Sequence, residues 1–353
     1  MTTFSCCMIV KNEEKVLRRC LDSICDLMDE IIIVDTGSTD STKAIASEYT
    51  DKIYDFEWID DFSAARNFSF SKATMDYIYT PDADEYLDEE NHHQLKLLKE
   101  CIDSEIDIVQ MMYNTVSLNT VLNIQREYRP RLFKRLRTFT WIDPIHETVR
   151  MNPLVFDSDI VITHAPEDNH AKRDFSIYQK HIKLGHELSR KLIFMYATEL
   201  IKVGTITDFE DAKDYFQQLF ECSDDNDIKV EAACVLFRLA RLKNDDEAFK
   251  KLLPEYPAVS NTSEICYDLG LHAIAQKNYE RAIDWLRMAI NEVHYALDVH
   301  TSGDLPLESL LFCYDTLIKR GDISQEQLEI YKSEYSVYSQ MLQTWAPPVE
   351  QPV

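Results

Sequence analysis

The stretch Tyr77-Ile-Tyr-Thr-Pro-Asp-Ala-Asp-Glu-Tyr86 decides the fold of the amino-terminal part of this sequence. An aromatic and β-branched run, typical of a strand, is followed at once by Asp82-Ala83-Asp84. A strand that ends in this way puts carboxylates at the edge of an α/β sheet where ligands bind. Carboxylate oxygens suit Mg²⁺ or Mn²⁺, and such an ion can hold a diphosphate. The pattern predicts a metal and phosphate site, with a solvated acidic loop as the alternative.

Strands and helices alternate along the first half of the sequence. We expect buried strands over 4–10, 30–34 and 53–56 and helices over 13–27, 41–49 and 62–74, with Asn12 as the cap of the first helix. This order predicts an α/β fold with a mostly parallel sheet and right-handed crossovers. Further on, we expect a helix over 92–104 and strands over about 107–117, 130–135, 147–151 and 157–163. The sheet is therefore expected to become mixed.

From about residue 168 the pattern is helical throughout. Apolar and small residues recur at a shared spacing: Tyr196 with Ala212 and Phe216, Leu236 with Ala248 and Leu252, and Gly270 with Ala282, Leu286 and Ala289. The last of these stretches resembles a tetratricopeptide repeat, in which small residues let paired helices pack closely. A fourth pair is expected over 304–320 and 323–344. We predict an α/β domain over 1–167, a linking helix over 168–190, an all-α repeat domain over 191–345 and a disordered tail over 346–353.

Composition narrows the classes of partner and compartment. The 353 residues include 37 Lys+Arg and 62 Asp+Glu, a formal charge of -25, which argues against non-specific binding to nucleic acid or to an anionic membrane. The longest aliphatic run, 31–34, is too short to span a bilayer, and we expect no signal peptide before Phe4. The nine cysteines form no CxxC pair, so we expect reduced thiols and a cytoplasmic location. Gly37, the only glycine before residue 185, is expected to need its backbone freedom.

Two further motifs carry candidate binding residues. Asp35-Thr36-Gly37-Ser38-Thr39-Asp40 joins a strand to a helix, where Asp35 can accept from a base or a ribose hydroxyl. For residues 38–40 we favour a turn, with Ser38 as the helix cap. In Asp61-Phe-Ser-Ala-Ala-Arg-Asn67, Arg66 lies on a helix whose apolar face includes Phe62, Ala65 and Phe68. It can stack on a base or neutralise a phosphate, and a surface ion pair is the alternative.

Four motifs together resemble family 2 glycosyltransferases of the GT-A fold. They are Cys7-Met-Ile-Val-Lys-Asn-Glu-Glu14, Val34-Asp-Thr-Gly-Ser-Thr-Asp40, Phe62-Ser-Ala-Ala-Arg-Asn67 and Asp82-Ala-Asp-Glu85, and the resemblance covers roughly residues 1–165. It implies an inverting transfer from a nucleotide-activated sugar, usually a UDP-sugar, with Mn²⁺ or Mg²⁺.

The resemblance assigns roles by position. Val10, Asp35 and Arg66 should line the nucleoside site, and Thr36 stands where many relatives carry a second aspartate. Asp82 should face the ribose or the metal, with Ala83 beside the donor, and Asp84 should be the main metal ligand. His164, at the end of Ile160-Val-Ile-Thr-His164, should be the third protein ligand, with a hydrogen-bonded histidine as the alternative.

The segment Trp141-Ile-Asp-Pro-Ile-His-Glu147 resembles the place where such enzymes keep their acceptor-side carboxylate. Inversion needs one base to deprotonate the acceptor. We expect Glu147 to be that base, with Asp143 as the second choice, and a salt-bridged residue at a strand start is the alternative for Glu147. His146 is expected to touch a phosphate or to orient Glu147.

The combination of domains resembles bacterial transferases that glycosylate peptides or proteins, and the repeats are expected to bind the acceptor or to form a homodimer. An acidic groove there would favour a basic peptide. A lipopolysaccharide-core or other glycan acceptor is the alternative. A nucleotidyltransferase would need a glycine-rich basic loop, which residues 6–14 lack. A non-catalytic scaffold is disfavoured because Asp82, Asp84, Glu147 and His164 are all present.

Overall fold

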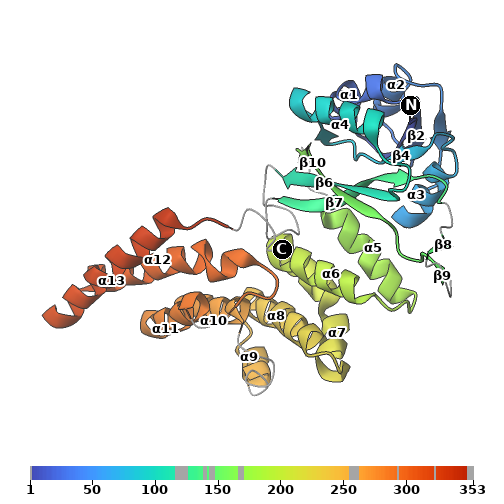
Figure 1. Ribbon diagram of the computed structural model, residues 1–353. Helices are drawn as coiled ribbons and strands as arrows, with labels where there is room; N and C mark the ends of the chain where they lie inside the picture. The colour runs from blue at the N-terminus through green and yellow to red at the C-terminus, as the bar shows by residue number, and fades with distance from the viewer. Residues whose placement is uncertain are drawn as a thin grey trace. The chain divides into compact units, whose positions relative to one another are not determined.

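The computed structural model describes residues 2–115, 126–137, 141–142, 148–165, 171–253, 262–291, 294–321 and 323–347. The chain divides into two compact units (Figure 1). We call them the sheet unit, which holds the described residues up to 165, and the helical unit, which holds those from 171 to 347.

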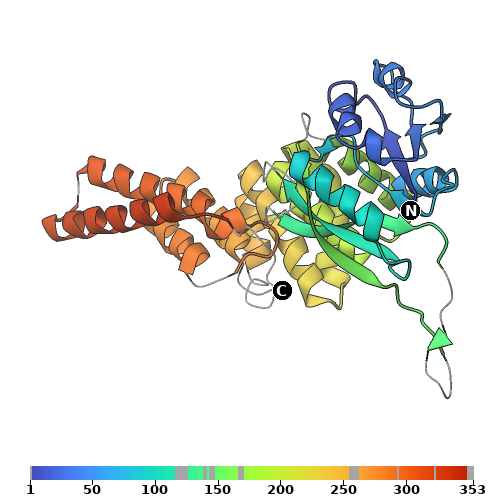
Figure 2. The same ribbon diagram turned by 45° about the horizontal axis from the view of Figure 1, so that its top comes forward.

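In the described part of the sheet unit, eight strands form one mixed sheet of order β3-β2-β1-β4-β7-β6-β10-β5. The strands are β1 (Phe4–Val10), β2 (Glu30–Asp35), β3 (Ile53–Asp55), β4 (Tyr77–Tyr79), β5 (Glu85–Tyr86), β6 (Ile108–Thr115), β7 (Arg126–Lys134) and β10 (Val155–His164). The first four are parallel, and β7 then runs antiparallel to β4. The hairpin of β8 (Trp141–Ile142) and β9 (Thr148–Val149) is a separate two-stranded sheet, which lies apart from the large one (Figure 2).

The local sequence explains these elements. All residues of β2 and nearly all of β1 are buried, which fits the apolar runs 6–10 and 31–34 within them. The helices are α1 (Leu17–Asp22), the short 3₁₀ turn η1 (Cys25–Leu27), α2 (Thr42–Ala46), α3 (Phe62–Phe70) and α4 (Glu89–Cys101). The carboxylates of Asp61 and Asp88 cap α3 and α4 by accepting from backbone N–H groups. Phe62 is 43% exposed, so the expected apolar face of α3 is limited to Ala65 and the half-buried Phe68.

Two expected helix caps are wrong. Asn12 has a φ of 57° and does not cap α1, which begins only at Leu17. Its side-chain oxygen instead accepts from the Thr39 N–H at 2.8 Å. The Ser38 hydroxyl accepts from the Asn12 N–H at 2.9 Å, and the N–H of Thr42 at the start of α2 is bound by Asp40. The loops after β1 and β2 therefore hold each other, and Asp40, not Ser38, binds the start of α2.

The expectation for Gly37 is confirmed. Its φ is +99°, in the region that side chains with a Cβ rarely adopt. The short strand β5 was not expected from the sequence, and it pairs with β10 through Tyr86–Thr163 and Glu85–His164.

The described helical unit consists of paired helices. They are α5 (Ala171–Lys183), α6 (Arg190–Val203), α7 (Ile206–Cys222), α8 (Asn226–Lys243), α9 (Asp246–Leu252), α10 (Ser263–Ala275), α11 (Tyr279–Asn291), the 3₁₀ turn η3 (Val299–Ser302), α12 (Asp304–Arg320) and α13 (Gln325–Thr344). A Cβ added to Gly270 would lie 2.8 Å from the Leu286 side chain, so close packing of α10 on α11 depends on the missing side chain. Figure 1 shows α12 and α13 side by side, as expected for the fourth pair.

The expected layout is confirmed: a domain with a mixed α/β sheet precedes an all-α region. All nine cysteines are free, and six of them are buried: Cys6, Cys7, Cys20, Cys234, Cys266 and Cys313. Within the described ranges, none of the helices combines the length and the apolar character needed to cross a membrane.

Candidate functional site

The ends of three parallel strands gather the candidate residues at one edge of the sheet. Val10 and Asp35 are register partners at the ends of β1 and β2. Thr36 donates from its N–H to the Val10 carbonyl at 3.0 Å and from its hydroxyl at 3.2 Å. These two hydrogen bonds tie Thr36 to the end of β1. Because β4 lies on the other side of β1, the chain leaving β4 carries residues 82–84 to the same edge.

Asp35 has one satisfied and one unsatisfied carboxylate oxygen. Its Oδ2 accepts from the N–H groups of Gly37 and Ser38, each at 3.0 Å, which is the turn that the sequence indicated. Its Oδ1 is buried and has no hydrogen-bond partner, and the residue is only 2% exposed. Burying an acceptor without a donor costs about 1–3 kcal/mol. The edge therefore presents an acceptor that suits a donor group on a ligand.

Asp82 lies between two arginines. Arg66 on α3 is 3.4 Å from Oδ1, and Arg131 on β7 is 3.2 Å from Oδ2. Partial burial opposes ionisation of Asp82, but Arg131 and Arg66 outweigh it, so the pKa of this carboxyl lies below its ordinary value. The Nη1 of Arg66 is buried without a partner, so it can still donate to a ligand.

Glu85 belongs to the same charged cluster as Asp82 and Arg131. It is 1% exposed, pairs with Arg131, and accepts from the Asp82 N–H at 3.1 Å. Burial raises the pKa of Glu85 well above its ordinary value, and the neighbouring Asp82 charge adds to this. The charge of Arg131 thus offsets the repulsion between two carboxyl groups that lie close together.

Asp84 and His164 meet at the opposite side of the loop. The His164 Nε2 is 3.0 Å from the Asp84 Oδ2, although the two residues are 80 positions apart. The Ala165 N–H donates to the Asp84 carbonyl at 3.1 Å. Arg19 on α1 donates to the carbonyls of Asp84 and Ala165 at 3.2 and 2.9 Å. This clamp fixes both loops that carry the pair.

The donor set fits a divalent metal ion in part. The Asp84 Oδ2 and the His164 Nε2 are 3.0 Å apart and hydrogen-bond each other, which is the alternative expected for His164, and a carboxylate oxygen and an imidazole nitrogen are donor types that Mn²⁺ accepts. The Asp82 carboxylate is directed to the two arginines instead. Among the described side chains, no group of three or more His, Cys, Asp or Glu is gathered so as to hold a metal.

Of the remaining expected site residues, the structure describes one and leaves three outside its described ranges. Ala83 is buried between the two aspartates. Asp143, His146 and Glu147 lie outside the described residues.

Arg19 and Arg131 were not predicted from the sequence. A signal for Arg131 was present, because Arg129-Pro-Arg131 places two arginines on one face of a strand next to apolar residues. Arg19 had no such signal, since its partners are backbone atoms far along the chain.

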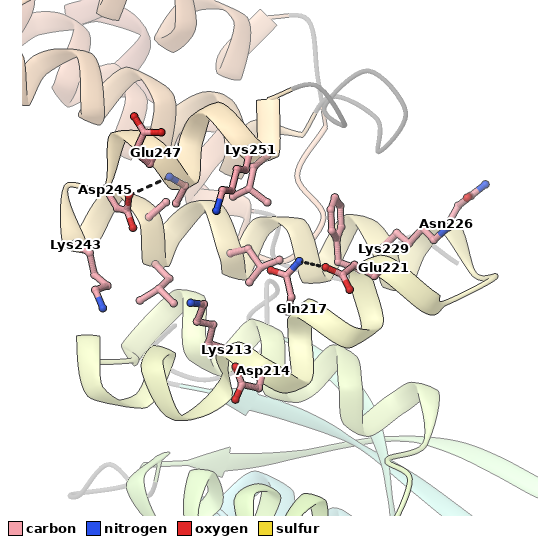
Figure 3. Close-up of a pocket in the computed structure, with 16 residues that line it drawn as sticks. Lys213, Asp214, Gln217, Glu221, Asn226, Lys229, Lys243, Asp245, Glu247 and Lys251 are labelled. Atoms are coloured by element: carbon pink, nitrogen blue, oxygen red, sulfur yellow. Dashed lines mark hydrogen bonds between the residues drawn. The ribbon is translucent and has the colours of Figure 1, made fainter.

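The helical unit has its own cavity, of about 1040 Å³, between α7, α8 and α9 (Figure 3). Its floor is apolar and includes Phe220, Leu236 and Leu252. Its charged lining comprises Lys213, Lys229, Lys243 and Lys251 with Asp214, Glu221, Asp245 and Glu247. The two signs are therefore balanced in this cavity, so it is not an acidic groove of the kind that would favour a basic peptide.

Part of the chain is similar in sequence to known proteins. Residues 5–160 match the family "Glycosyl transferase family 2". A TPR repeat-containing protein of Synechococcus elongatus is 40% identical over 151 residues, which cover 42% of this chain and 36% of the relative. The SPbeta prophage-derived glycosyltransferase SunS of Bacillus subtilis is 29% identical over 231 residues, 61% of this chain and 53% of the relative. The chain thus spans between about a third and a half of these relatives.

Solved structures also resemble the chain at low identity. A glucosyl-3-phosphoglycerate synthase from Mycobacterium tuberculosis, in complex with Mn²⁺ and UDP-glucose, is 16% identical, with 53% of this chain and 81% of that chain covered and a TM-score of 0.38. TarS of S. aureus is 13% identical, with 79% and 54% covered and a TM-score of 0.34.

Proposed function

We propose that the protein transfers a sugar from a UDP-sugar to an acceptor with inversion at the anomeric carbon, and the match of residues 5–160 to the family Glycosyl transferase family 2 supports this proposal. The observation that carries the proposal is that the Oδ1 of Asp35 and the Nη1 of Arg66 are both buried without a hydrogen-bond partner. A nucleotide offers the complement of both, because a uracil N–H or ribose hydroxyl can donate and a base carbonyl or phosphate can accept.

The metal belongs to the opposite side of the same edge. Asp84 and His164 would hold Mn²⁺ or Mg²⁺, whose charge would stabilise the departing diphosphate. Asp82, held by Arg66 and Arg131, remains available to a ribose hydroxyl through its outer face, because its side chain is 46% exposed.

The reaction needs a base on the acceptor side. We assign this role to Glu147, with Asp143 as the second choice and His146 as a contact to phosphate. The acceptor oxygen or sulfur gives its proton to the carboxylate and forms a bond to the anomeric carbon, while the bond from that carbon to the diphosphate oxygen breaks. UDP leaves with the electron pair of the broken bond.

The acceptor in this proposal is a peptide or protein side chain, with a glycan as the alternative. The cavity between α7, α8 and α9 supports a polypeptide, because it combines an apolar floor with lysines and carboxylates that can pair with either charge (Figure 3). The free thiols of all nine cysteines support a reducing, cytoplasmic compartment.

The test measures thermal stabilisation and slow donor hydrolysis with UDP-, GDP- and dTDP-sugars and Mn²⁺. We expect one UDP-sugar to stabilise the wild type and to be hydrolysed, and Asp84→Ala to lose the metal-dependent part of both. Asp51→Ala, an exposed aspartate outside the site, serves as the control and should behave as wild type.

A second variant separates the nucleotide from the metal. Asp35→Ala should weaken UDP binding about 10-fold or more, because a hydrogen bond to a charged group contributes about 1.5–3 kcal/mol. Its Mn²⁺ affinity should not change. If no nucleotide sugar binds with any metal, the sheet unit is not an active transferase.

A further inference from the structure

Tyr113 on β6 lies in the middle of a column of stacked side chains. It is 3% exposed. The guanidinium carbon of Arg129 on β7 is 3.8 Å from the centre of its ring. The His164 ring on β10 is 5.0 Å from the Tyr113 ring, with 30° between the two planes. Because β6 lies between β7 and β10 in the sheet, Tyr113 is flanked by Arg129 on one side and by His164 on the other.

His164 is restrained in different ways by its contacts to Asp84 and to Tyr113. The approach of Nε2 to Asp84 fixes one end of the imidazole. The Tyr113 ring restrains the plane of the imidazole, which the contact to Asp84 leaves free to rotate. Arg129 holds the tyrosine in turn, since a guanidinium is attracted to the face of an aromatic ring.

We infer that Tyr113 is a positioning residue, which together with Arg129 orients His164 so that its imidazole and the Asp84 carboxylate can hold a divalent cation together. This inference rests on the proposed function, because it assumes that the pair is a metal site. Groups that orient a metal ligand without touching the metal commonly change metal affinity about 10–100-fold. A tyrosine that only filled the core would change stability and leave metal affinity unaltered.

The experiment measures Mn²⁺ affinity directly, from the electron paramagnetic resonance signal of free Mn²⁺ in the presence of UDP. We expect Tyr113→Leu to bind Mn²⁺ about 10-fold more weakly than wild type. Tyr113→Phe keeps the ring and should restore the affinity to within about twofold of wild type. His164→Ala marks the full loss of the imidazole.

Tyr128→Leu is the matched control. Tyr128 is a 41% exposed tyrosine on the adjacent strand β7, and its removal should leave Mn²⁺ affinity unchanged. Melting temperatures of all variants identify those that fail to fold. If Tyr113→Leu is among them, Arg129→Met decides, because Arg129 is at the outer end of the column: a weakening of about threefold supports the inference and wild-type affinity contradicts it.

The outcomes also separate this inference from the proposed function. Wild-type affinity in Tyr113→Leu, together with weak binding in His164→Ala, overturns the positioning role and leaves the metal site standing. Unchanged affinity in both His164→Ala and Asp84→Ala removes the metal site itself, and the positioning role with it.

Discussion

The two units satisfy their buried charges in different ways. In the helical unit, Arg238 and Arg241 both bind the fully buried Asp268, at 2.7 and 2.5 Å. Glu264, also fully buried, accepts from the N–H groups of residues 296–298. In the sheet unit, Asp35, Arg66, Asp107 and Arg131 each keep a buried polar atom without a partner, and Arg66 and Arg131 both contact Asp82.

Buried charges that are paired stabilise the fold, whereas buried polar atoms without a partner can bind a ligand. The unpaired polar atoms of Glu199 and His272 lie on separate helices, α6 and α10. In the sheet unit, Arg66 and Arg131 both contact Asp82, and Asp35 ends a strand at the same edge of the sheet, so a single ligand can satisfy several of the unpaired atoms. Clustering of the unpaired atoms, and not their presence, therefore indicates the site.

The largest expected effect concerns the buried charges of the sheet unit. Arg131→Met leaves Glu85 and Asp82 close together without their shared cation, so the free energy of unfolding of the sheet unit should fall by about 3–5 kcal/mol. Hydrogen exchange of the β1 and β2 amides measures this, and the amides of α8 should not change. Arg137→Met, which removes an arginine that is 40% exposed, is the control and should lose less than about 1 kcal/mol. An equally small loss in Arg131→Met would mean that the cluster does not depend on this cation.

A medium effect is expected for the close packing of α10 on α11 in the helical unit. Gly270→Ala puts a methyl group 2.8 Å from the Leu286 side chain and should destabilise the helical unit by about 1–3 kcal/mol. The control is the same substitution in a Leu286→Ala background, where the contact is gone and the cost should drop below about 1 kcal/mol. Urea unfolding of the four proteins completes the cycle. Additive costs would show that the two residues do not meet.

The smallest effect concerns Glu199, a carboxyl on α6 with one unpaired oxygen. Burial first, and then the nearby Asp174 charge, raise the pKa of Glu199 to about 8. The folded state therefore keeps a proton that the unfolded state releases near pH 4.5, so this stability is complete below pH 4.5 and is lost as the pH rises through about 8. Glu199→Gln removes the titration and should gain about 1 kcal/mol over wild type at pH 8, after allowance for solvent screening.

Melting temperatures at pH 5 and pH 8 check this prediction. The advantage of Glu199→Gln should appear at pH 8 and be absent at pH 5. Two curves that stay parallel across this range would show that Glu199 titrates as an ordinary carboxyl.

Local patterns made most of the fold predictable. The strands β1 and β2 contain the apolar runs 6–10 and 31–34, and the helix pairs follow a spacing that is repeated within about 40 residues. The Asn12 cap was predicted wrongly because its true partner, Thr39, lies 27 residues away and belongs to another loop. The two-residue strand β5 has too little sequence to be recognised, and only its pairing with β10 makes it a strand.

The candidate site was predictable where it follows from strand ends. Asp35 and Asp82–Asp84 come directly after strands, so their common edge follows from the alternation of elements. Arg131 could not be placed, because its contact to Asp82 crosses 49 residues and depends on an antiparallel strand. Glu147 and Asp143 as the base stay predictions.

The pairing of Asp84 with His164 also has a consequence for the order in which the protein can become competent. The two residues are separated by 80 positions, and β10 reaches its place only by pairing with β6 and β5. Closing so long a loop is slow compared with the local contacts of a helix pair. A nascent chain on the ribosome can form β1, β2 and the Asp35 turn well before residue 164 has been made. The cation-holding pair is thus among the last features of the sheet unit to appear during synthesis, and a chain cut short before β10 lacks it altogether.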